Sequence, residues 1–144
     1  MKTELVSVII NSHNGSKYIN RSVTSALMQS YKNLEIIFWD NASTDNTKEI
    51  IHQANFDQRF KYFYSGNFDK LYKAKNKAVK LAGGKYLAFL DVDDWWMRDK
   101  LIKQISIMEE KKSIISSTNY FIFNEKKKTK QRKYLNQILI LLKL

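Results

Sequence analysis

The sequence contains no cysteine and no proline among its 144 residues. The absence of cysteine excludes disulfide bonds, thiolate zinc sites and a cysteine nucleophile, and it favours an intracellular setting. Because proline is absent, turns must depend on glycine, asparagine, aspartate and serine. Only two histidines are present, His13 and His52, so a histidine-based triad or metal cluster has little material.

Long hydrophobic runs are also missing. The most apolar terminal run, ILILLKL at residues 138–144, is far shorter than the roughly 20 residues that span a bilayer. The N-terminal stretch MKTELVSVII lacks the long apolar segment and the small-residue cleavage site of a signal peptide. We therefore expect a soluble, cytoplasmic protein.

The net charge of +11 is concentrated in the last part of the sequence. Residues 111–144 contain nine lysines or arginines and one acidic residue, Glu125. The preceding residues are close to charge balance, so the charge does not mark the whole chain as a nucleic-acid-binding protein. With 44% hydrophobic residues, the chain has enough apolar mass for one globular domain.

Apolar runs and helical patterns alternate along the chain. The runs predict β-strands at residues 5–10, 34–39, 60–65, 85–90 and 113–123. Helical spacing of apolar residues follows the first four runs, and the fourth helix is predicted to begin near Trp96. This alternation predicts an α/β fold, a mostly parallel sheet with helices on both faces. The loops at the strand carboxyl ends then meet at one edge, where such sheets bind ligands.

Three polar loops fall on that edge, with the sequences NSHNG, DNASTDNT and DVDD. None contains the glycine fingerprint of dinucleotide-binding or P-loop enzymes. The aspartates Asp91, Asp93 and Asp94 can hold a hard divalent cation that takes its other ligands from substrate phosphates. The same carboxylates could instead cap the helix predicted near Trp96, and from this stretch alone the two interpretations are equally supported. Trp95 and Trp96 are typical of packing positions.

Four segments resemble family 2 glycosyltransferases in order, spacing and content: VSVIINSHNGSKYI, LEIIFWDNASTDNT, AKNKAVKLAGGKYLAFLDVDD and WWMRDKL. The resemblance covers about residues 4–110 and continues more weakly to about 125. It implies an inverting enzyme with a GT-A-like, Rossmann-type sheet that transfers a sugar from a nucleotide-diphosphate donor. Mn²⁺ or Mg²⁺ bridges the diphosphate in this family, which favours the metal interpretation of DVDD over the capping one.

The resemblance also implies roles for individual positions. DVDD matches the family's Asp-x-Asp motif, so Asp91 and Asp93 would lie near the ribose and the metal, with Asp93 or Asp94 as metal ligand. The family's Pro-Thr-Tyr-Asn segment matches residues 11–14, which would place its first and third residues beside the nucleobase. The implied nucleotide-sugar-binding residues are Asn11, His13, Asn14, Asp40, Asn41, Lys75, Asn76 and Asp91, and the implied metal ligands are Asp93 and Asp94.

Three positions depart from the family's usual pattern. Asn41 stands where many members have a carboxylate that accepts a hydrogen bond from uracil, and an amide donates as well as accepts. Lys75 keeps the charge of the usual arginine without its planar fork, which weakens bidentate phosphate contact. His13 replaces a common tyrosine and has less surface to stack on a base. A UDP-sugar nevertheless remains the expected donor.

The largest departure is length. In the family, the acceptor-binding half and the catalytic carboxylate lie well downstream of Asp-x-Asp. Here Glu125 is the only acidic residue after Glu110, and its lysine-rich surroundings are typical of a solvated surface. We therefore expect residues 1–125 to form an incomplete donor-binding domain, truncated after the Asp-x-Asp half and without a general base, and residues 126–144 to form a basic, then apolar tail. The expected acceptor is a cell-surface saccharide or a lipid-linked saccharide.

A second hypothesis is a non-catalytic binding module. Its basic tail would dock on an anionic membrane surface, where each basic residue contributes about 1 kcal/mol, or on nucleic acid. Nucleic acid is not the expected partner, because the tail has no interleaved aromatic residue apart from Tyr134. A simpler interpretation of the tail is that it has no packing partner, so that residues 126–133 are disordered and residues 138–144 are exposed. We favour this interpretation over a dedicated membrane anchor.

Overall fold

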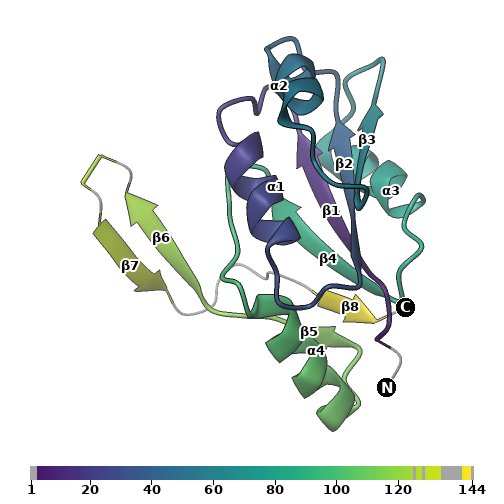
Figure 1. The fold of residues 1–144 in the computed structure, drawn as a ribbon, viewed down its shortest axis with the longest axis vertical. Helices are drawn as coiled ribbons and strands as arrows, with labels where there is room; N and C mark the ends of the chain where they lie inside the picture. The colour runs from purple at the N-terminus through teal and green to yellow at the C-terminus, as the bar shows by residue number, and fades with distance from the viewer. Residues whose placement is uncertain (1–2, 125, 128, 134–140, 144) are drawn as a thin grey trace.

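Strands and helices alternate through most of the chain, as the apolar patterns predicted (Figure 1). The computed structural model describes residues 3–124, 126–127, 129–133 and 141–143. In chain order the elements are β1 (Val6–Ser12), α1 (Ile19–Leu27), β2 (Leu34–Asp40), α2 (Thr47–Ala54), β3 (Phe60–Tyr64), α3 (Leu71–Val79), β4 (Tyr86–Asp91), α4 (Lys100–Lys111), β5 (Ile115–Ser116), β6 (Tyr120–Asn124), β7 (Thr129–Lys133) and β8 (Leu141–Lys143).

A six-stranded sheet forms the centre of the fold, in the order β3-β2-β1-β4-β8-β5. The first four of these strands are parallel, and β8 pairs antiparallel with both β4 and β5. All seven residues of β1 are buried, because this strand lies between β2 and β4 inside the sheet. The predicted α/β fold with a mostly parallel sheet is confirmed.

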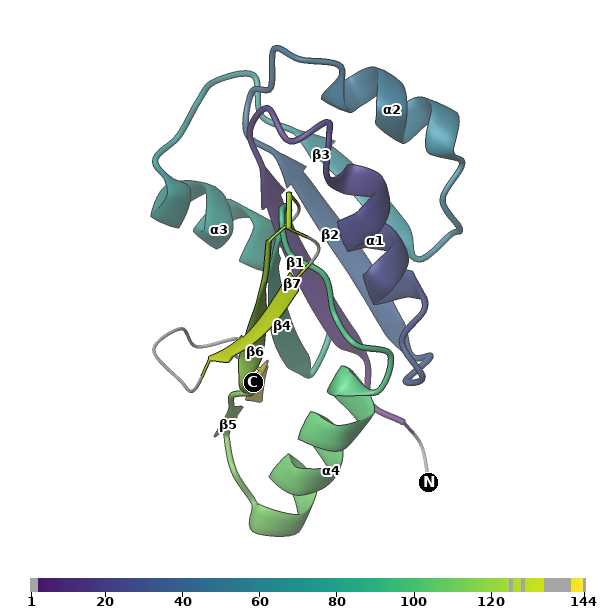
Figure 2. The same cartoon turned by 90° about the vertical axis from the view of Figure 1, so that its left-hand side faces the viewer.

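Helices cover both faces of this sheet. Figure 2 shows α1 and α2 on one face and α3 on the other. Alternate residues of β1 point to opposite faces: Val8 and Ile10 join the larger apolar cluster, whereas Ile9 joins the smaller one with Ala78 of α3. Burial on both faces explains why the central strands are mostly apolar along their length and do not alternate strictly between apolar and polar residues.

The fourth helix begins later than the sequence predicted, at Lys100 instead of near Trp96. The fully buried Gln29 side chain, which follows α1, explains the difference. Its Nε2 donates a hydrogen bond to the Met97 carbonyl at 2.9 Å, and its Oε1 accepts one from the Leu101 N–H at 3.1 Å. Gln29 thereby caps α4 from a distant part of the chain, and the DVDD carboxylates lie too far upstream to do so.

Residues 113–123 form two strands rather than the single one predicted. β5 lies at the edge of the main sheet, whereas β6 pairs with β7 in a separate two-stranded hairpin. The hairpin stands away from the six-stranded sheet (Figure 1). The described part of residues 126–133 therefore belongs to this hairpin and is not the unstructured segment that we expected.

The apolar stretch 138–144 was expected to be exposed, and its described part is not. Leu141 is fully buried, because β8 inserts between β4 and β5 and satisfies the open edge of β4. Residues 134–140 and 144 lie outside the described residues. Within the part of the chain that the structure describes, no helix is both long enough and apolar enough to cross a bilayer.

Candidate functional site

The carboxyl ends of three parallel strands lie side by side. In the register of the sheet, Ser12 of β1 pairs with Asp40 of β2, and Asn11 of β1 pairs with Asp91 of β4. The three polar loops therefore start from adjacent points on one edge of the sheet, which is the arrangement that the predicted topology required.

Asn14 fastens the first of these loops to the second. Its φ of 54° lies in the left-handed region, which asparagine tolerates better than most residues. Its Oδ1 accepts a hydrogen bond from the Thr44 N–H at 2.8 Å, and its own N–H donates to Ser43 Oγ at 2.9 Å. The side chain that the family pattern assigned to nucleotide binding thus braces the loop that carries its neighbour His13.

Asp40 has a similar bracing role. It is fully buried, and its carboxylate accepts hydrogen bonds from the Tyr62 hydroxyl at 2.8 Å and the Ser43 N–H at 2.9 Å. Burial raises the pKa of Tyr62, and the hydrogen bond to Asp40 adds to the shift. Both oxygens of Asp40 are therefore hydrogen-bonded within the protein, and the bond from the Ser43 N–H fixes the start of the second loop.

Asn41 connects the first loop to the loop that follows β3. Its carbonyl oxygen accepts a hydrogen bond from His13 Nδ1 at 2.9 Å, so that nitrogen carries the proton. Its side-chain Nδ2 donates to the Asp69 carbonyl at 2.8 Å, and its Oδ1 accepts from the Asp69 N–H at 3.1 Å. Asn41 is 5% exposed, so it is buried between the first loop and the loop that follows β3.

Three side chains at the ends of β1 and β2, those of Asn11, Ser12 and Trp39, have buried polar atoms without hydrogen-bond partners among the described residues. Asn11 is 8% exposed, and neither its Oδ1 nor its Nδ2 has a hydrogen-bond partner among the described residues. The indole N–H of Trp39, its register partner on β2, is likewise unpaired there. An unpaired buried polar group costs about 1–3 kcal/mol and calls for an explanation such as a bound ligand or water.

Lys75 and Asp91 form an ion pair across this edge. Lys75 projects from α3, and its Nζ lies 3.2 Å from Asp91 Oδ1. Asn76, the next residue of α3, is exposed. The structure thus brings Lys75 to the end of β4 and leaves its ammonium accessible to an anionic ligand.

The Asp91–Asp94 segment is a tight turn whose three carboxyl groups are exposed. The Asp94 N–H donates to the Asp91 carbonyl at 3.0 Å, and Arg21 of α1 donates to the Asp93 carbonyl at 3.0 Å. Desolvation raises the pKa of Asp94, and the like charges of Asp93 and Asp91 add to the shift. The turn therefore presents mutually repelling carboxylates beside the end of β4.

These carboxylates do not form a preassembled metal cage. Among the described residues, no group of three or more His, Cys, Asp or Glu side chains is placed to hold a metal ion. The chemistry of the turn nevertheless fits a hard cation held by one or two carboxylates, with its remaining ligands coming from a diphosphate. The mutual repulsion around Asp94 is a charge imbalance that such a cation relieves.

A cavity of about 670 Å³ adjoins the turn, between α1, the start of α4 and strand β6. Its wall includes Arg21, whose guanidinium lies 4.3 Å from the Trp95 ring centroid, and Lys100. Burial lowers the pKa of Lys100 to about 8, and its ammonium lies 4.4 Å from the Trp96 ring centroid. Trp96 is 5% exposed and packs in the core, as predicted, whereas Trp95 is 36% exposed and meets Phe123 edge-on.

Sequence reasoning missed several residues of this edge. Arg21 and Lys100 carry no local motif, and only the packing of α1 against the start of α4 brings them together. Phe68 sits in a loop without a recognisable pattern, yet its ring centroid lies 4.6 Å from that of His13. An aromatic residue between polar loop residues was the one signal that could have drawn attention to Phe68.

The family model of glycosyl transferase family 2 matches residues 7–143 of this chain. The UDP-Glc:alpha-D-GlcNAc-diphosphoundecaprenol beta-1,3-glucosyltransferase WfaP of Escherichia coli is 44% identical over 119 residues, which are 83% of this chain and 47% of that protein. The putative teichuronic acid biosynthesis glycosyltransferase TuaG of Bacillus subtilis is 43% identical over 117 residues, 81% of this chain and 46% of that protein. The chain therefore belongs to glycosyl transferase family 2.

Solved structures support the same assignment. S. aureus TarS 1-349 in complex with UDP superposes with a TM-score of 0.70 at 26% identity, over 76% of this chain and 33% of that chain. The mannosyltransferase PcManGT from Pyrobaculum calidifontis, in complex with GDP-Man and Mn²⁺, gives a TM-score of 0.67 at 25% identity, over 72% and 32% of the two chains. The present chain spans about half the length of WfaP and TuaG, at 47% and 46%.

Proposed function

We propose that this chain binds a nucleotide-diphosphate sugar at the carboxyl edge of its sheet and takes part in inverting glycosyl transfer. The observation that carries the proposal is the shared register of β1, β2 and β4, which gathers the His13, Asn41 and Asp91 loops on one edge. The unpaired Asn11 amide and the accessible Lys75 ammonium at the same edge offer groups for a polar, anionic ligand.

Asp93 and Asp94 are the residues that we propose to hold Mn²⁺ or Mg²⁺. When bound, the cation would neutralise the charge that develops on the diphosphate leaving group. Lys75 adds a second positive charge beside Asp91, and we propose that Asp91 accepts hydrogen bonds from the ribose hydroxyls. The PcManGT complex with GDP-Man and Mn²⁺ supports this proposal, because it shows a protein of similar fold with both a nucleotide sugar and a divalent cation.

Inverting transfer forms a bond from an acceptor oxygen to the anomeric carbon while the bond to the diphosphate oxygen breaks on the opposite side. The acceptor proton must pass to a base. Each of the three carboxylates in residues 95–124 already forms an ion pair, namely Asp99 with Lys103, Glu109 with Lys143 and Glu110 with Lys111. We assign none of them as the base, and Glu125 lies outside the described residues.

We propose a UDP-sugar as donor and a lipid-linked or cell-surface saccharide as acceptor. The names of two similar proteins support these classes, since WfaP uses UDP-Glc with a diphosphoundecaprenol-linked acceptor and TarS is solved with UDP-GlcNAc. A lipid-linked acceptor places the reaction at the cytoplasmic surface of a membrane. Phe121 and Ile122 are exposed on β6, and the β6–β7 hairpin that contains them is also basic. This combination favours peripheral contact with that surface over nucleic acid.

A thermal-shift and calorimetric screen tests the donor site. We expect UDP with Mn²⁺ to raise the melting temperature by about 5–10 °C at a hundredfold excess over its Kd, and UDP without metal to do much less. The double variant Asp93→Asn, Asp94→Asn should lose the metal-dependent part, while the surface control Glu110→Gln keeps it. Equal shifts with and without metal in the wild-type chain, or a metal-dependent shift that survives in the Asp93→Asn, Asp94→Asn variant, would contradict the proposed metal site. No binding of any nucleoside diphosphate by the wild-type chain would contradict the donor function.

A further inference from the structure

Phe68 presents an exposed aromatic ring at the proposed donor site. Its side chain is 63% exposed, and its ring centroid lies 4.6 Å from the His13 ring with an interplanar angle of 64°. The two rings therefore form a corner above Asn41, whose carbonyl holds His13 Nδ1 at 2.9 Å. The ring face of Phe68 at this corner is therefore open to a ligand.

The backbone around Phe68 is fixed on both sides. Before it, the Ser65 N–H donates to the Asp40 carbonyl at 2.8 Å and Ser65 Oγ donates to the Asn67 carbonyl at 2.7 Å. After it, the Asp69 backbone makes its two hydrogen bonds to the Asn41 side chain, at 2.8 and 3.1 Å. The ring is thus held at the edge by the ends of β2 and β3.

This clamp leaves Asn41 poorly placed to read a base. Its amide oxygen and amide nitrogen both engage Asp69, and the residue is 5% exposed. A base that took hydrogen bonds from Asn41 would have to compete with the clamp. An aromatic face makes no such demand, because every nucleobase has a π surface that can stack on it.

We propose that Phe68 is the stacking surface for the nucleobase of the donor, with His13 at its edge, and that Asn41 positions Phe68 rather than recognising the base. This inference rests on the proposed donor function. It assigns the base affinity to stacking and predicts weak discrimination between uridine and guanosine diphosphates at this corner, since stacking is tolerant of base identity.

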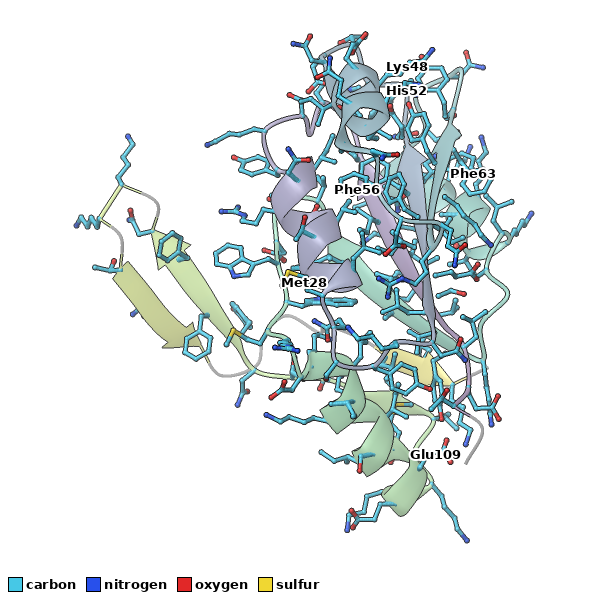
Figure 3. All side chains as sticks on the ribbon, in the orientation of Figure 1. Met28, Lys48, His52, Phe56, Phe63 and Glu109 are labelled. Carbon is cyan, nitrogen blue, oxygen red and sulfur yellow. The ribbon has the colours of Figure 1, made fainter. Side chains whose placement is uncertain are left out.

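Isothermal titration of the full chain with UDP, GDP and inorganic diphosphate, each with Mn²⁺, tests the stacking role. We expect Phe68→Ala to weaken both nucleotides about tenfold and to leave diphosphate affinity unchanged. Phe68→Tyr should restore nucleotide affinity to within about twofold of the wild type. The control Met28→Ala alters a side chain of similar exposure, 59%, at the far end of α1 (Figure 3). It should change neither the nucleotide affinities nor the diphosphate affinity.

The outcomes separate the two proposals. If the wild-type chain binds UDP and Phe68→Ala binds it equally well, the stacking role is wrong and the donor function stands. If Phe68→Ala weakens diphosphate as much as UDP, the residue supports the site only indirectly and the inference is overturned. If the wild-type chain binds no nucleotide, the donor function fails and the inference fails with it.

A double-variant cycle tests the positioning role of Asn41. Asn41→Asp keeps the acceptor for the Asp69 N–H but places a carboxylate oxygen against the Asp69 carbonyl, which opens the clamp. We expect its loss of UDP affinity to approach that of Phe68→Ala, and the double variant to lose little more, because both act through one ring. Additive losses, or an Asn41→Asp variant that gains selectivity for UDP over GDP, would show instead that residue 41 reads the base.

Discussion

Glu35 is the most heavily hydrogen-bonded carboxylate at the end of the sheet opposite the site. It is 6% exposed and accepts hydrogen bonds from Ser7 Oγ at 2.6 Å, Lys61 Nζ at 2.6 Å and the Gly83 N–H at 2.8 Å. Burial acts to raise its pKa, but the bonds from Lys61, Ser7 and Gly83 together hold that pKa below its usual range. One side chain thus joins β1, β2, β3 and the start of β4.

The sign of the Glu35 shift gives a pH prediction. Because the folded-state pKa is depressed, the stabilisation is fully present above the unfolded pKa of about 4.3 and is lost as pH falls through the folded value. We expect Glu35→Gln to lower the free energy of unfolding at pH 7 by about 1–3 kcal/mol. Urea unfolding at pH 7 and in steps below pH 5 measures this difference, which should shrink as the wild-type carboxylate becomes protonated.

The control for this prediction is Glu110→Gln, which changes an exposed carboxylate on α4. It should shift stability by less than about 0.5 kcal/mol at either pH. A Glu35→Gln variant whose deficit does not depend on pH would show that the hydrogen-bond geometry matters and the charge does not.

At the scale of elements, β8 stabilises the main sheet by pairing with both β4 and β5. Leu141 is fully buried and packs in the larger apolar cluster, where its strand pairs with β4 through Ala88. We expect Leu141→Ala to cost about 2–5 kcal/mol of unfolding free energy, as for other buried leucines. Ile114→Ala, at a site that is 70% exposed, is the matched apolar control and should cost less than about 0.5 kcal/mol.

Denaturant titration of both variants decides whether β8 belongs to the cooperative unit. Equal, small effects of Leu141→Ala and Ile114→Ala would place β8 outside it. A large loss at Leu141 without a change in the m-value would show that β8 unfolds together with β1 and β4.

The strands and helices up to β4 could be predicted from the sequence because their signals are local. Val8–Ile10 forms an apolar, β-branched centre in β1, and the four predicted strands 5–10, 34–39, 60–65 and 85–90 each lay within a few residues of the observed bounds. The start of α4 could not be found in this way, since Gln29 caps it from across the fold. The placement of β8 likewise depends on the open edge of β4, which no local pattern reveals.

The same contrast holds for the site. The parallel topology was enough to predict that the DVDD turn and the first two loops share an edge. It could not show that Asn14 and Asp40 turn their oxygens toward the protein, because these hydrogen bonds link residues that are distant in sequence. Phe68 was missed for a related reason, since its position depends on Asn41 and not on its own neighbours.

At the scale of the whole molecule, charge and apolar surface coincide on the β6–β7 hairpin. Phe121 and Ile122 are 56% and 47% exposed, and six of the eight residues 126–133 are lysine or arginine. Each basic residue near an anionic leaflet contributes about 1 kcal/mol. The combination predicts reversible binding of the full chain to anionic vesicles and little binding to neutral ones.

Co-sedimentation with phosphatidylcholine vesicles, with and without about 30% phosphatidylglycerol, measures this binding. Reversing two hairpin charges, Lys126→Glu and Lys127→Glu, should weaken it by at least about tenfold. The matched control Lys48→Glu, Lys80→Glu makes the same change in net charge elsewhere on the surface. Equal losses in the two double variants would show that net charge alone, and not the hairpin, drives the attachment.

The antiparallel insertion of β8 has a consequence for how the chain is made. β4 pairs with residues that follow it by roughly fifty positions. At synthesis rates of about 5–20 residues per second, the edge of β4 therefore stays open for several seconds after it leaves the ribosome. During that interval the nascent chain exposes an unpaired apolar strand, which is the kind of edge that recruits another chain. Expression yield should therefore depend on how quickly translation reaches Leu141.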